Sequence, residues 1–208
     1  MTHRDLKTYR RYGPRVHLID SRGCAAVEKT FRDAPLPVRL LGLVLVSWES
    51  FIYSRLSGIE GIPELLPSPD RLTLTTRFMG GTNLKETSLT PNARYFEELG
   101  ELIHAMHQRG VIHLDLRNRR NYGLDDKGRP YLVDFATCLY IPWVPGLRRA
   151  LATIDWMGLA KIKNRLNPEL LEDREKRLLA LGTRLSSWWL PARAVRGIRR
   201  LVGKAGRP

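Results

Sequence analysis

The stretch VIHLDLRNRRNYGL, residues 111–124, decides the fold of this chain. It begins as an apolar, strand-like run that carries His113 and Asp115, and it continues into three arginines bracketed by two asparagines. A basic loop of this kind suits either a grip on nucleic-acid phosphates or an active site that handles a phosphate group. Residues elsewhere in the chain have to distinguish these two interpretations.

Composition places the chain among folded, strongly basic proteins. Of its 208 residues, 43 % are hydrophobic and 27 % are charged, which is ordinary for a globular protein and excludes a wholly disordered one. A chain of this length builds one sizeable core or two small lobes. The 35 Lys and Arg outnumber the 21 Asp and Glu, so the net charge is +14. We therefore expect an anionic partner, such as nucleic acid, anionic lipid or a nucleotide phosphate.

The cysteine content and the hydropathy pattern predict a cytoplasmic protein. Two cysteines, Cys24 and Cys138, are too few for a disulfide framework or a four-ligand zinc site. The start, MTHRDLKTYRR, lacks the apolar core of a signal peptide. The longest apolar stretch, residues 40–48, has about half of the roughly 20 residues that a membrane span requires. Peripheral attachment to the inner face of the membrane stays open.

Apolar patterning predicts that the first part of the chain is rich in strands. Alternation within residues 15–31 predicts two strands around a Ser-Arg-Gly turn. After prolines at positions 35 and 37, the long apolar run of residues 38–56 predicts a helix, and residues 71–79 predict another strand. The segment MGGTNL, residues 79–84, then turns the chain.

The second part of the pattern is mostly helical. Residues 92–110 place apolar side chains at the helical period, and Gly110 ends that helix. Two short strands follow, residues 121–124 and 129–133, joined by the turn sequence DDKG. From Tyr140 onward the pattern is helical and basic.

The order of these elements predicts an α+β protein with two lobes. The first lobe, residues 1–80, contains a small antiparallel sheet with one helix. The second lobe, residues 81–177, is a reduced helical lobe. Residues 178–208 form a basic amphipathic tail.

Two charged residues occupy apolar positions in the first lobe. In the strand AAVEKTF, residues 25–31, alternation puts Lys29 on the apolar face. Glu49 lies in an almost wholly apolar helical run, and a buried carboxylate is costly unless it is paired. Lys29 and Glu49 are therefore candidates for an ion pair. The alternatives are a lysine that reaches water at the lobe edge and a glutamate on the exposed stripe of the helix.

Two more acidic residues lie at the ends of strand-like runs. Asp115 belongs to VIHLDL and Asp134 to PYLVDF, where a charge must face a ligand, a metal or water. Together with Asn121 they offer oxygen ligands that suit Mg²⁺, which prefers a few carboxylates and substrate phosphates. A lysine for phosphates, a carboxylate base and oxygen ligands for magnesium are the parts that phosphoryl transfer requires.

These residues, in this order, resemble the protein-kinase-like superfamily. HLDLRNRRN and LVDFA, with VEKTF and WESFIYSRL upstream, carry the resemblance over about residues 10–165. Within that superfamily, this short chain is most similar to the bacterial lipopolysaccharide (Kdo/heptose) kinases and the RIO-like kinases. Lys29 and Glu49 are 20 residues apart, and Asn121 and Asp134 are 13 apart, both close to the separations in that superfamily.

The resemblance implies a role for each candidate in catalysis. Lys29 would bind the α and β phosphates of ATP and be held by Glu49. Asp115 would accept the proton of the acceptor hydroxyl or orient that hydroxyl. Arg117 would steady the transferred phosphate. Arg119 and Arg120 would contact an anionic acceptor or form part of the inserted turn.

The resemblance also implies the binding groups around the nucleotide. Asn121 and Asp134 would hold magnesium, and backbone groups near Phe78 and Met79 would meet the adenine as the hinge between lobes. His113 is interpreted as structural, packing under the loop and bonding to backbone.

Three departures from the family pattern accompany these matches. The family loop places its asparagine five residues after the aspartate, but here it comes one later, at Asn121, which we interpret as a one-residue insertion with Asn118 as the alternative ligand. The third residue of the DFG-like motif is Ala136. No three-glycine loop precedes Lys29, and Gly13, 16 residues earlier, is its candidate remnant.

The chain after Asp134 is short, which bears on the acceptor. IDWMGLAKIKNRL, residues 154–166, resembles the aspartate-bearing helix of larger kinases. There is little room before it for a long activation segment. We therefore expect a small or membrane-presented acceptor in preference to a protein docked on a large helical lobe.

The tail, residues 178–208, contains seven Lys or Arg and no Asp or Glu. Its apolar and basic residues alternate at a helical period after Trp188 and Trp189, which predicts a helix in an anionic membrane interface, bound through residues 186–208. Each basic residue near such a surface contributes about 1 kcal/mol. The alternatives are that the tryptophans pack on the second lobe, or that the arginines bind nucleic acid, for which no recognised fold is present.

We therefore expect a monomeric ATP- and magnesium-dependent phosphotransferase that moves the γ-phosphate to a hydroxyl, on a sugar of lipopolysaccharide type. Two alternatives stay open. One is a pseudokinase scaffold, because the glycine loop is missing and the asparagine is shifted. The other is a RIO-like protein kinase or an RNA-associated basic protein.

Overall fold

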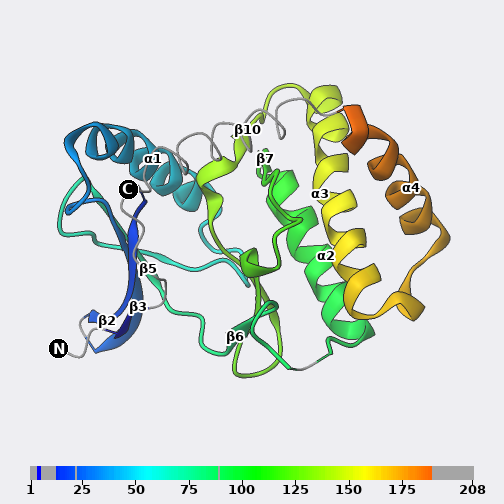
Figure 1. Ribbon diagram of the computed structural model, residues 1–208, viewed down its shortest axis with the longest axis horizontal. Helices are drawn as coiled ribbons and strands as arrows, with labels where there is room; N and C mark the ends of the chain where they lie inside the picture. The colour runs from blue at the N-terminus through cyan, green and yellow to red at the C-terminus, as the bar shows by residue number, and fades with distance from the viewer. Residues whose placement is uncertain (1–3, 6–12, 22, 89, 189–208) are drawn as a thin grey trace, which may run out of the picture.

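A five-stranded antiparallel sheet and one long helix make up the first lobe of the computed structural model, which describes residues 4–5, 13–21, 23–88 and 90–188 (Figure 1). In spatial order the strands are β1 (Arg4–Asp5), β2 (Arg15–Ser21), β3 (Cys24–Thr30), β5 (Thr73–Arg77) and β4 (Leu65–Leu66). The second lobe is mainly helical (Figure 1). The predicted α+β class is thus confirmed.

The central strand β3 fixes the position of Lys29. It pairs with β2 on one side and β5 on the other, and Lys29 lies opposite Val16 and Leu74 in the two registers. Within β3 the buried residues Ala26 and Thr30 share the face opposite to Lys29, whereas on the Lys29 side Ala25 is exposed and Phe31, directly after the strand, is buried. The alternation pattern did not predict the buried face of Ala26 and Thr30, because small and hydroxyl side chains occur on buried and on exposed faces.

Helix α1 (Leu36–Arg55) packs against this sheet. It begins two residues before the predicted start, because a proline can occupy the first turn of a helix without losing a needed hydrogen bond. Its buried face includes Gly42, and a Cβ there would lie 2.6 Å from the Phe31 ring. Glycine at this position therefore allows α1 to approach β3 closely.

By length and composition α1 could cross a membrane. Only 28 % of its most apolar 18 residues is buried inside the protein. The helix nevertheless carries the buried Glu49 on the face that contacts the first-lobe sheet and the Asp134 segment. We therefore describe α1 as a helix of the folded lobe with an uncovered outer face.

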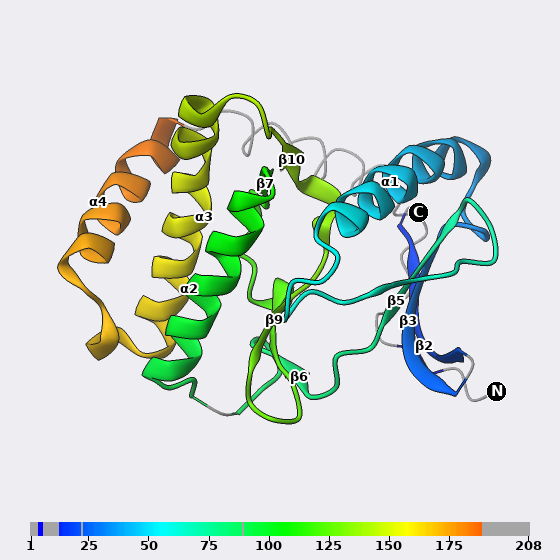
Figure 2. The same cartoon turned by 180° about the vertical axis from the view of Figure 1, so that it is seen from behind.

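Three long helices and two small sheets form the second lobe (Figures 1 and 2). The helices are α2 (Ala93–Gln108), α3 (Pro145–Leu166) and α4 (Asp173–Trp188). One small sheet has the order β6 (Thr82–Asn83), β8 (Tyr122–Leu124), β9 (Pro130–Leu132). The other pairs β10 (Leu139–Tyr140) with β7 (Val111–Ile112). Three 3₁₀ turns complete the lobe, η1 (Arg119–Asn121), η2 (Phe135–Thr137) and η3 (Pro168–Leu170).

Helix α2 forms the centre of the core in this lobe. Asn92 caps its start by accepting a hydrogen bond from the Tyr95 backbone N–H at 3.0 Å. The apolar positions predicted from the sequence are all buried: Tyr95, Phe96, Leu99, Leu102, Ile103 and Met106. Gly110, at φ +80°, ends the turn after the helix, and a Cβ there would lie 2.8 Å from Pro142.

The β8–β9 hairpin positions two candidate ligands next to each other. Its register pairs Tyr122 with Leu132, and the Val133 N–H donates to the Asn121 carbonyl at 3.0 Å. Asp134 follows directly. The predicted hairpin is present, with Asp125 Oδ1 accepting two backbone hydrogen bonds within the turn.

Helices α3 and α4 pack against each other in antiparallel directions (Figures 1 and 2). Lys163 Nζ donates to Glu175 Oε2 at 2.8 Å near one end, and Gly182 lies beside the Met157 sulfur further along. The end of α4 therefore lies beside the first turns of α3. Residues 178–188 of the predicted tail belong to α4, and residues 189–208 lie outside the described part of the chain.

Candidate active site

Lys29 joins the two lobes at the candidate site. Its ammonium donates to Glu49 Oε2 at 2.7 Å and to Asp134 Oδ1 at 3.0 Å. Glu49 is only 2 % exposed, on the inner face of α1, while Asp134 follows β9 in the second lobe. Three residues separated by up to 105 positions in sequence thus meet at one nitrogen.

Burial and charge act in opposite directions on this cluster. Burial alone would lower the pKa of the Lys29 ammonium, but the charges of Glu49 and Asp134 raise that pKa above its ordinary value. Burial raises the pKa of Glu49 above its ordinary value, and the charge of Lys29 only partly offsets this. Lys29 is therefore held as a cation, ready to contact an anionic ligand.

A series of buried aromatic side chains, referred to as the stack, connects α1 to the loop that carries Asp115. The Phe135 ring lies 5.0 Å from the Tyr53 ring of α1 and 5.0 Å from the His113 ring. His113 is buried and its Nε2 lies 3.2 Å from the Val133 carbonyl. The structural interpretation of His113 thus agrees with its surroundings. The stack holds Asp134, which directly precedes Phe135, against the helix that carries Glu49.

Asp115 and Asn121 lie together in the loop that follows β7. Asn121 Nδ2 donates to the Asp115 carbonyl at 3.1 Å and to Asp115 Oδ2 at 3.2 Å. Asn121 is buried, whereas Asn118 is exposed and uses its side-chain oxygen to cap η1 by accepting from the Arg120 N–H. The 3₁₀ turn that Asn118 caps brings Asn121, and not Asn118, to the aspartate.

Asp155 of α3 anchors the same loop through hydrogen bonds to its backbone. Its carboxylate accepts the His113 and Leu114 backbone N–H groups at 2.8 Å each, and it lies 2.9 Å from His107 Nε2. Leu114 adopts a left-handed conformation, with φ +64°, which is unfavourable for a branched side chain. The two hydrogen bonds to Asp155 hold this strained backbone in the conformation that presents Asp115.

Asp134 has the second left-handed backbone among the described non-glycine residues, with φ +67°. Aspartate tolerates this region better than most residues do. The conformation turns the chain sharply from β9 into η2. Strained backbone on both sides of the site, at Leu114 and Asp134, is a feature of functional sites.

The segment between the lobes is held by hydrogen bonds to both lobes. Phe78 N–H donates to the Ala25 carbonyl at 3.0 Å, and Gly81 N–H donates to Asp126 Oδ1 at 2.8 Å. A Cβ on Gly81 would lie 1.9 Å from the Leu124 carbonyl oxygen. The double glycine therefore allows the hinge to lie directly on the β8–β9 hairpin.

The loop carries three arginines whose guanidinium groups have no side-chain partner among the described residues. Arg117 and Arg120 are exposed and Arg119 is partly exposed. Within the described ranges, none of their guanidinium groups forms a side-chain hydrogen bond or an ion pair. They are available for an anion from outside.

The oxygen ligands available for magnesium at the site are few. No group of three or more His, Cys, Asp or Glu gathers at one point in the described residues. Asn121 and Asp134 are brought close by the hairpin register and offer one amide and one carboxylate. This limited oxygen set suits a magnesium ion that keeps waters and binds substrate phosphates, and it does not suit a metal held by protein ligands alone.

Sequence reasoning missed two functional positions. His107 was predicted only as part of an apolar helix, yet it contacts Asp155; its presence on the buried face was the available signal. Asp126 was predicted only as a turn residue, and nothing in the local sequence indicates that it contacts Gly81, 45 positions away.

Three features define a protein-kinase-like fold: the strand order, the lysine bound to a helix glutamate, and the loop anchored by Asp155. Comparison with solved structures supports this fold. The Rio2 kinase–ADP/Mg²⁺–phosphoaspartate complex from Chaetomium thermophilum has a TM-score of 0.58 and 18 % identity, covering 74 % of this chain and 52 % of that one. Rio2 kinase from the same organism also has a TM-score of 0.58, with 17 % identity over 74 % and 54 % of the two chains.

The chain spans about half the length of those two kinases. No protein-family model matches the sequence, and no curated protein matches it. The predicted protein-kinase-like, two-lobed fold and its likeness to RIO-like kinases are confirmed, whereas a closer likeness to lipopolysaccharide kinases stays a prediction.

Proposed function

We propose that this protein is an ATP- and magnesium-dependent phosphotransferase that transfers the γ-phosphate to a hydroxyl group. The observation that carries the proposal is the contact of Lys29 with both Glu49 and Asp134. A lysine that is fixed between the lobes by two carboxylates and kept cationic has the charge and position to bind a polyphosphate.

Nucleotide binding is assigned to both lobes. Lys29 would contact the α and β phosphates, and Glu49 would hold it in place. The adenine would lie at the hinge near Phe78 and Met79. Because the Phe78 N–H already bonds within the sheet, the contacts fall to the Phe78 carbonyl and to the Met79 backbone.

Transfer is assigned to Asp115 and Arg117. The carboxylate of Asp115 would accept the proton of the acceptor hydroxyl as that oxygen bonds to the γ-phosphorus. The bond from the γ-phosphorus to the bridging oxygen breaks, and ADP leaves with the electron pair. Arg117, two residues beyond Asp115 and exposed, would offset the charge on the transferred phosphoryl group.

Asn121 and Asp134 would hold the magnesium ion. When bound, the ion neutralises charge on the nucleotide phosphates. The residues themselves contribute position: the Asn121 amide fixes Asp115, and Asp134 is fixed by Lys29.

For the acceptor we propose an anionic sugar of lipopolysaccharide type, reached at the cytoplasmic face of the membrane. The support is the set of three unpaired arginines beside Asp115, within a chain of net charge +14. Arg119 and Arg120 lie one turn beyond Arg117, where they would contact a carboxylate or phosphate on the acceptor.

The test measures phosphoryl transfer from γ-labelled ATP with magnesium to a set of acceptors: Kdo₂–lipid A, free Kdo, a basic protein and RNA. Labelled sugar is expected, and it should disappear in Asp115→Asn but persist in Asp173→Asn, an exposed aspartate of α4. If magnesium ATP binds but neither an acceptor nor the protein itself is labelled, the protein is a scaffold. If magnesium ATP does not bind in a calorimetric titration, the proposal fails altogether.

A second candidate follows from the Rio2 structure, which contains a phosphoaspartate. In this alternative an aspartate of the chain itself receives the phosphoryl group. Hydroxylamine distinguishes the two, because it cleaves an acyl phosphate and leaves a sugar phosphate intact. Hydroxylamine-labile label on the protein, in the absence of any acceptor, would support the RIO-like alternative.

A further inference from the structure

Helix α1 has an apolar outer face that no described residue covers. Nine large hydrophobic side chains are exposed in the described residues, and four of them lie on α1, where their exposed fractions are 56 % to 67 %. Leu36, Leu40, Val44, Trp48 and Phe51 follow one another at the helical period, and we refer to them as the α1 stripe. A stripe of this size on one face indicates a binding surface.

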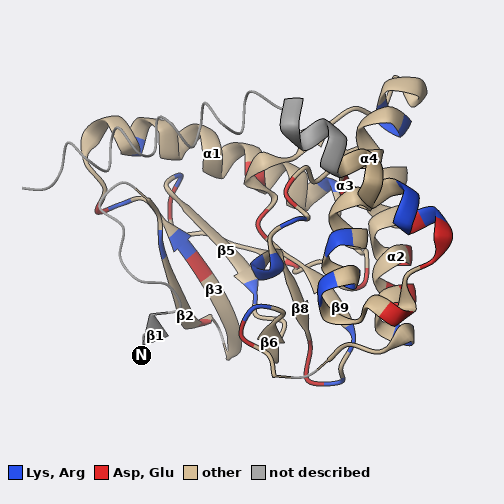
Figure 3. Ribbon diagram, turned by 45° about the vertical axis from the view of Figure 1, so that its right-hand side comes forward, with Lys and Arg blue, Asp and Glu red and all other residues tan. Residues whose placement is uncertain are grey.

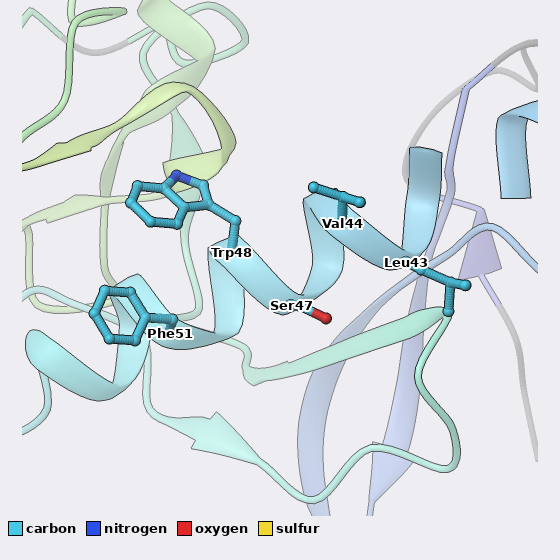
Figure 4. A pocket seen from close by; sticks show the side chains of 5 residues that line it. All are labelled: Leu43, Val44, Ser47, Trp48 and Phe51. Carbon is cyan, nitrogen blue, oxygen red and sulfur yellow. The ribbon is translucent and has the colours of Figure 1, made fainter. Parts of the chain in front are cut away.

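The stripe includes an open groove on the side of α1 opposite Glu49. Leu43, Val44, Ser47, Trp48 and Phe51 line this groove (Figure 4). Figure 3 shows α1 almost free of charged positions along its length, in contrast to α3 and α4. The groove is thus lined by four apolar side chains and one serine of the same helix.

Aromatic contacts continue the stripe toward the second lobe. The Trp48 and Phe51 rings are 5.6 Å apart, Phe51 and Tyr140 are 5.3 Å apart, and Tyr140 and Trp143 are 6.1 Å apart. Trp143 is 83 % exposed, and two more exposed side chains, Val144 and Leu147, follow it. A row of aromatic rings therefore runs from α1 to the first turn of α3, with the Arg55 guanidinium over the Phe51 and Tyr140 rings.

The described chain ends near this row of rings. Because α3 and α4 are antiparallel, the end of α4 lies beside the first turns of α3 (Figure 1). Twenty residues, 189–208, follow it. As a helix they would extend over about 30 Å, the same length as the 20 residues of α1.

We propose that residues 189–208 dock on the α1 stripe. The segment has apolar residues at helical spacing, Val195, Ile198 and Val202, with arginines between them. An amphipathic helix laid in an apolar groove is a common mode of association. The tether to α4 supplies a high effective concentration, so the intramolecular partner is favoured over one from solution.

The tether to α4, and not charge, favours this occupant over an anionic membrane. Arg39 and Arg55 are the only basic residues of α1, and the Arg55 guanidinium lies 4.9 Å from the centre of the Phe51 ring. In the docked arrangement the apolar side of the segment meets the stripe, and its arginines face solvent. If the proposed function holds, docking also holds Glu49, on the opposite face of α1, against Lys29.

The experiment is hydrogen–deuterium exchange on the full chain, without nucleotide. Backbone amides of residues 195–202 should exchange about tenfold more slowly than in a free peptide of the same sequence. Val44→Lys places a positive charge in the groove, and it should abolish this protection and accelerate exchange over residues 36–48. Leu181→Lys is the matched control, since Leu181 is 50 % exposed on α4, away from the stripe. It should leave both segments unchanged.

Three results would overturn the proposal. The first is exchange of residues 195–202 at free-peptide rates in the full chain. The second is protection that appears only with vesicles of anionic lipid, which Val44→Lys would strengthen and not weaken. The third is protection that grows with protein concentration and accompanies a dimer in light scattering, which would assign the stripe to a second copy. None of these readouts depends on phosphotransfer, so a failure here is distinguishable from a failure of the proposed function.

Discussion

Glu49 and Asp155 are two buried carboxylates that serve the same site in different ways. Glu49, on the first-lobe side, bonds a lysine ammonium that itself contacts Asp134 across the lobes. Asp155, in the second lobe, is fully buried and bonds two backbone N–H groups and a histidine. One carboxylate positions a charge for a ligand, and the other positions the backbone of a loop.

The two carboxylates differ in which groups would lose a hydrogen-bond partner if each carboxylate were removed. Without Asp155, two backbone amides and His107 lose their acceptor, and the strained Leu114 loses its support. Without Glu49, Lys29 keeps Asp134 as a partner. Unsatisfied buried donors destabilise a fold more than the loss of one member of a shared ion pair. We therefore expect Asp155 to govern stability and Glu49 to govern ligand affinity.

The largest effect is expected for Asp155→Ala. Loss of three buried hydrogen bonds should lower the free energy of unfolding by about 3 to 5 kcal/mol. Chemical denaturation measures this change. Asp173→Ala removes an exposed aspartate and should change stability by less than about 0.5 kcal/mol. A decrease for Asp155→Ala no larger than that of the control would contradict the anchoring role.

Replacement of Asn121 tests whether a residue that is buried, as Asp155 is, takes part in phosphoryl transfer. Asn121→Ala removes both contacts with Asp115 and one proposed magnesium ligand. The magnesium concentration required for half-maximal transfer should rise on the order of 100-fold. Asn118→Ala, which removes only the cap of η1, should leave this concentration nearly unchanged. Equal effects of the two variants would assign the ligand role to neither residue.

Glu49→Gln should separate affinity from stability. We expect the affinity for magnesium ATP to fall about tenfold in a calorimetric titration, because Lys29 loses its charged holder. The free energy of unfolding at neutral pH should change by no more than about 1 kcal/mol, since burial of the Glu49 charge is itself costly. Glu64→Gln, at an exposed ion pair with Arg77, is the control.

The pH dependence of the same variant has a definite sign. Folding raises the pKa of Glu49 above its ordinary value of 4.5, so the native state binds this proton more readily than the unfolded state. Stability from this carboxyl is therefore present below pH 4.5 and is lost as the pH rises through the raised pKa. Glu49→Gln should gain stability relative to the unchanged protein over that interval. A constant difference between the two proteins would show that folding leaves the Glu49 carboxyl unperturbed.

The same comparison shows which parts of the site could be predicted from sequence. Lys29 and Glu49 were detectable because each breaks an apolar pattern, and a broken pattern requires a compensating partner. Asp155 was detectable only through the resemblance of its helix. Its partner His107 was not predicted, because a helical period indicates which face is buried but not which buried group contacts which.

The fold was predictable in its elements and less so in its surfaces. The hairpins and α2 follow from turn residues and from a clear 3.6-residue period. In α1 the apolar run predicted a helix but concealed its exposed face, because apolar residues surround the whole helix and leave no polar side to identify. An exposed apolar face becomes visible only when the neighbouring elements are in place.

The smallest effect is expected at the hinge, where Asp126 acts on backbone, as Asp155 does, but from an exposed position. Asp126→Ala removes the hydrogen bond to the Gly81 N–H, which solvent can partly replace. We expect a twofold to fivefold loss of affinity for magnesium ATP, as for the loss of about one weak hydrogen bond. Unfolding should be almost unaffected. Lys127→Ala, at the next exposed residue of the turn, should change neither quantity. A loss of stability comparable to that of Asp155→Ala would show that contact with backbone, and not burial, decides how much a carboxylate contributes to the fold.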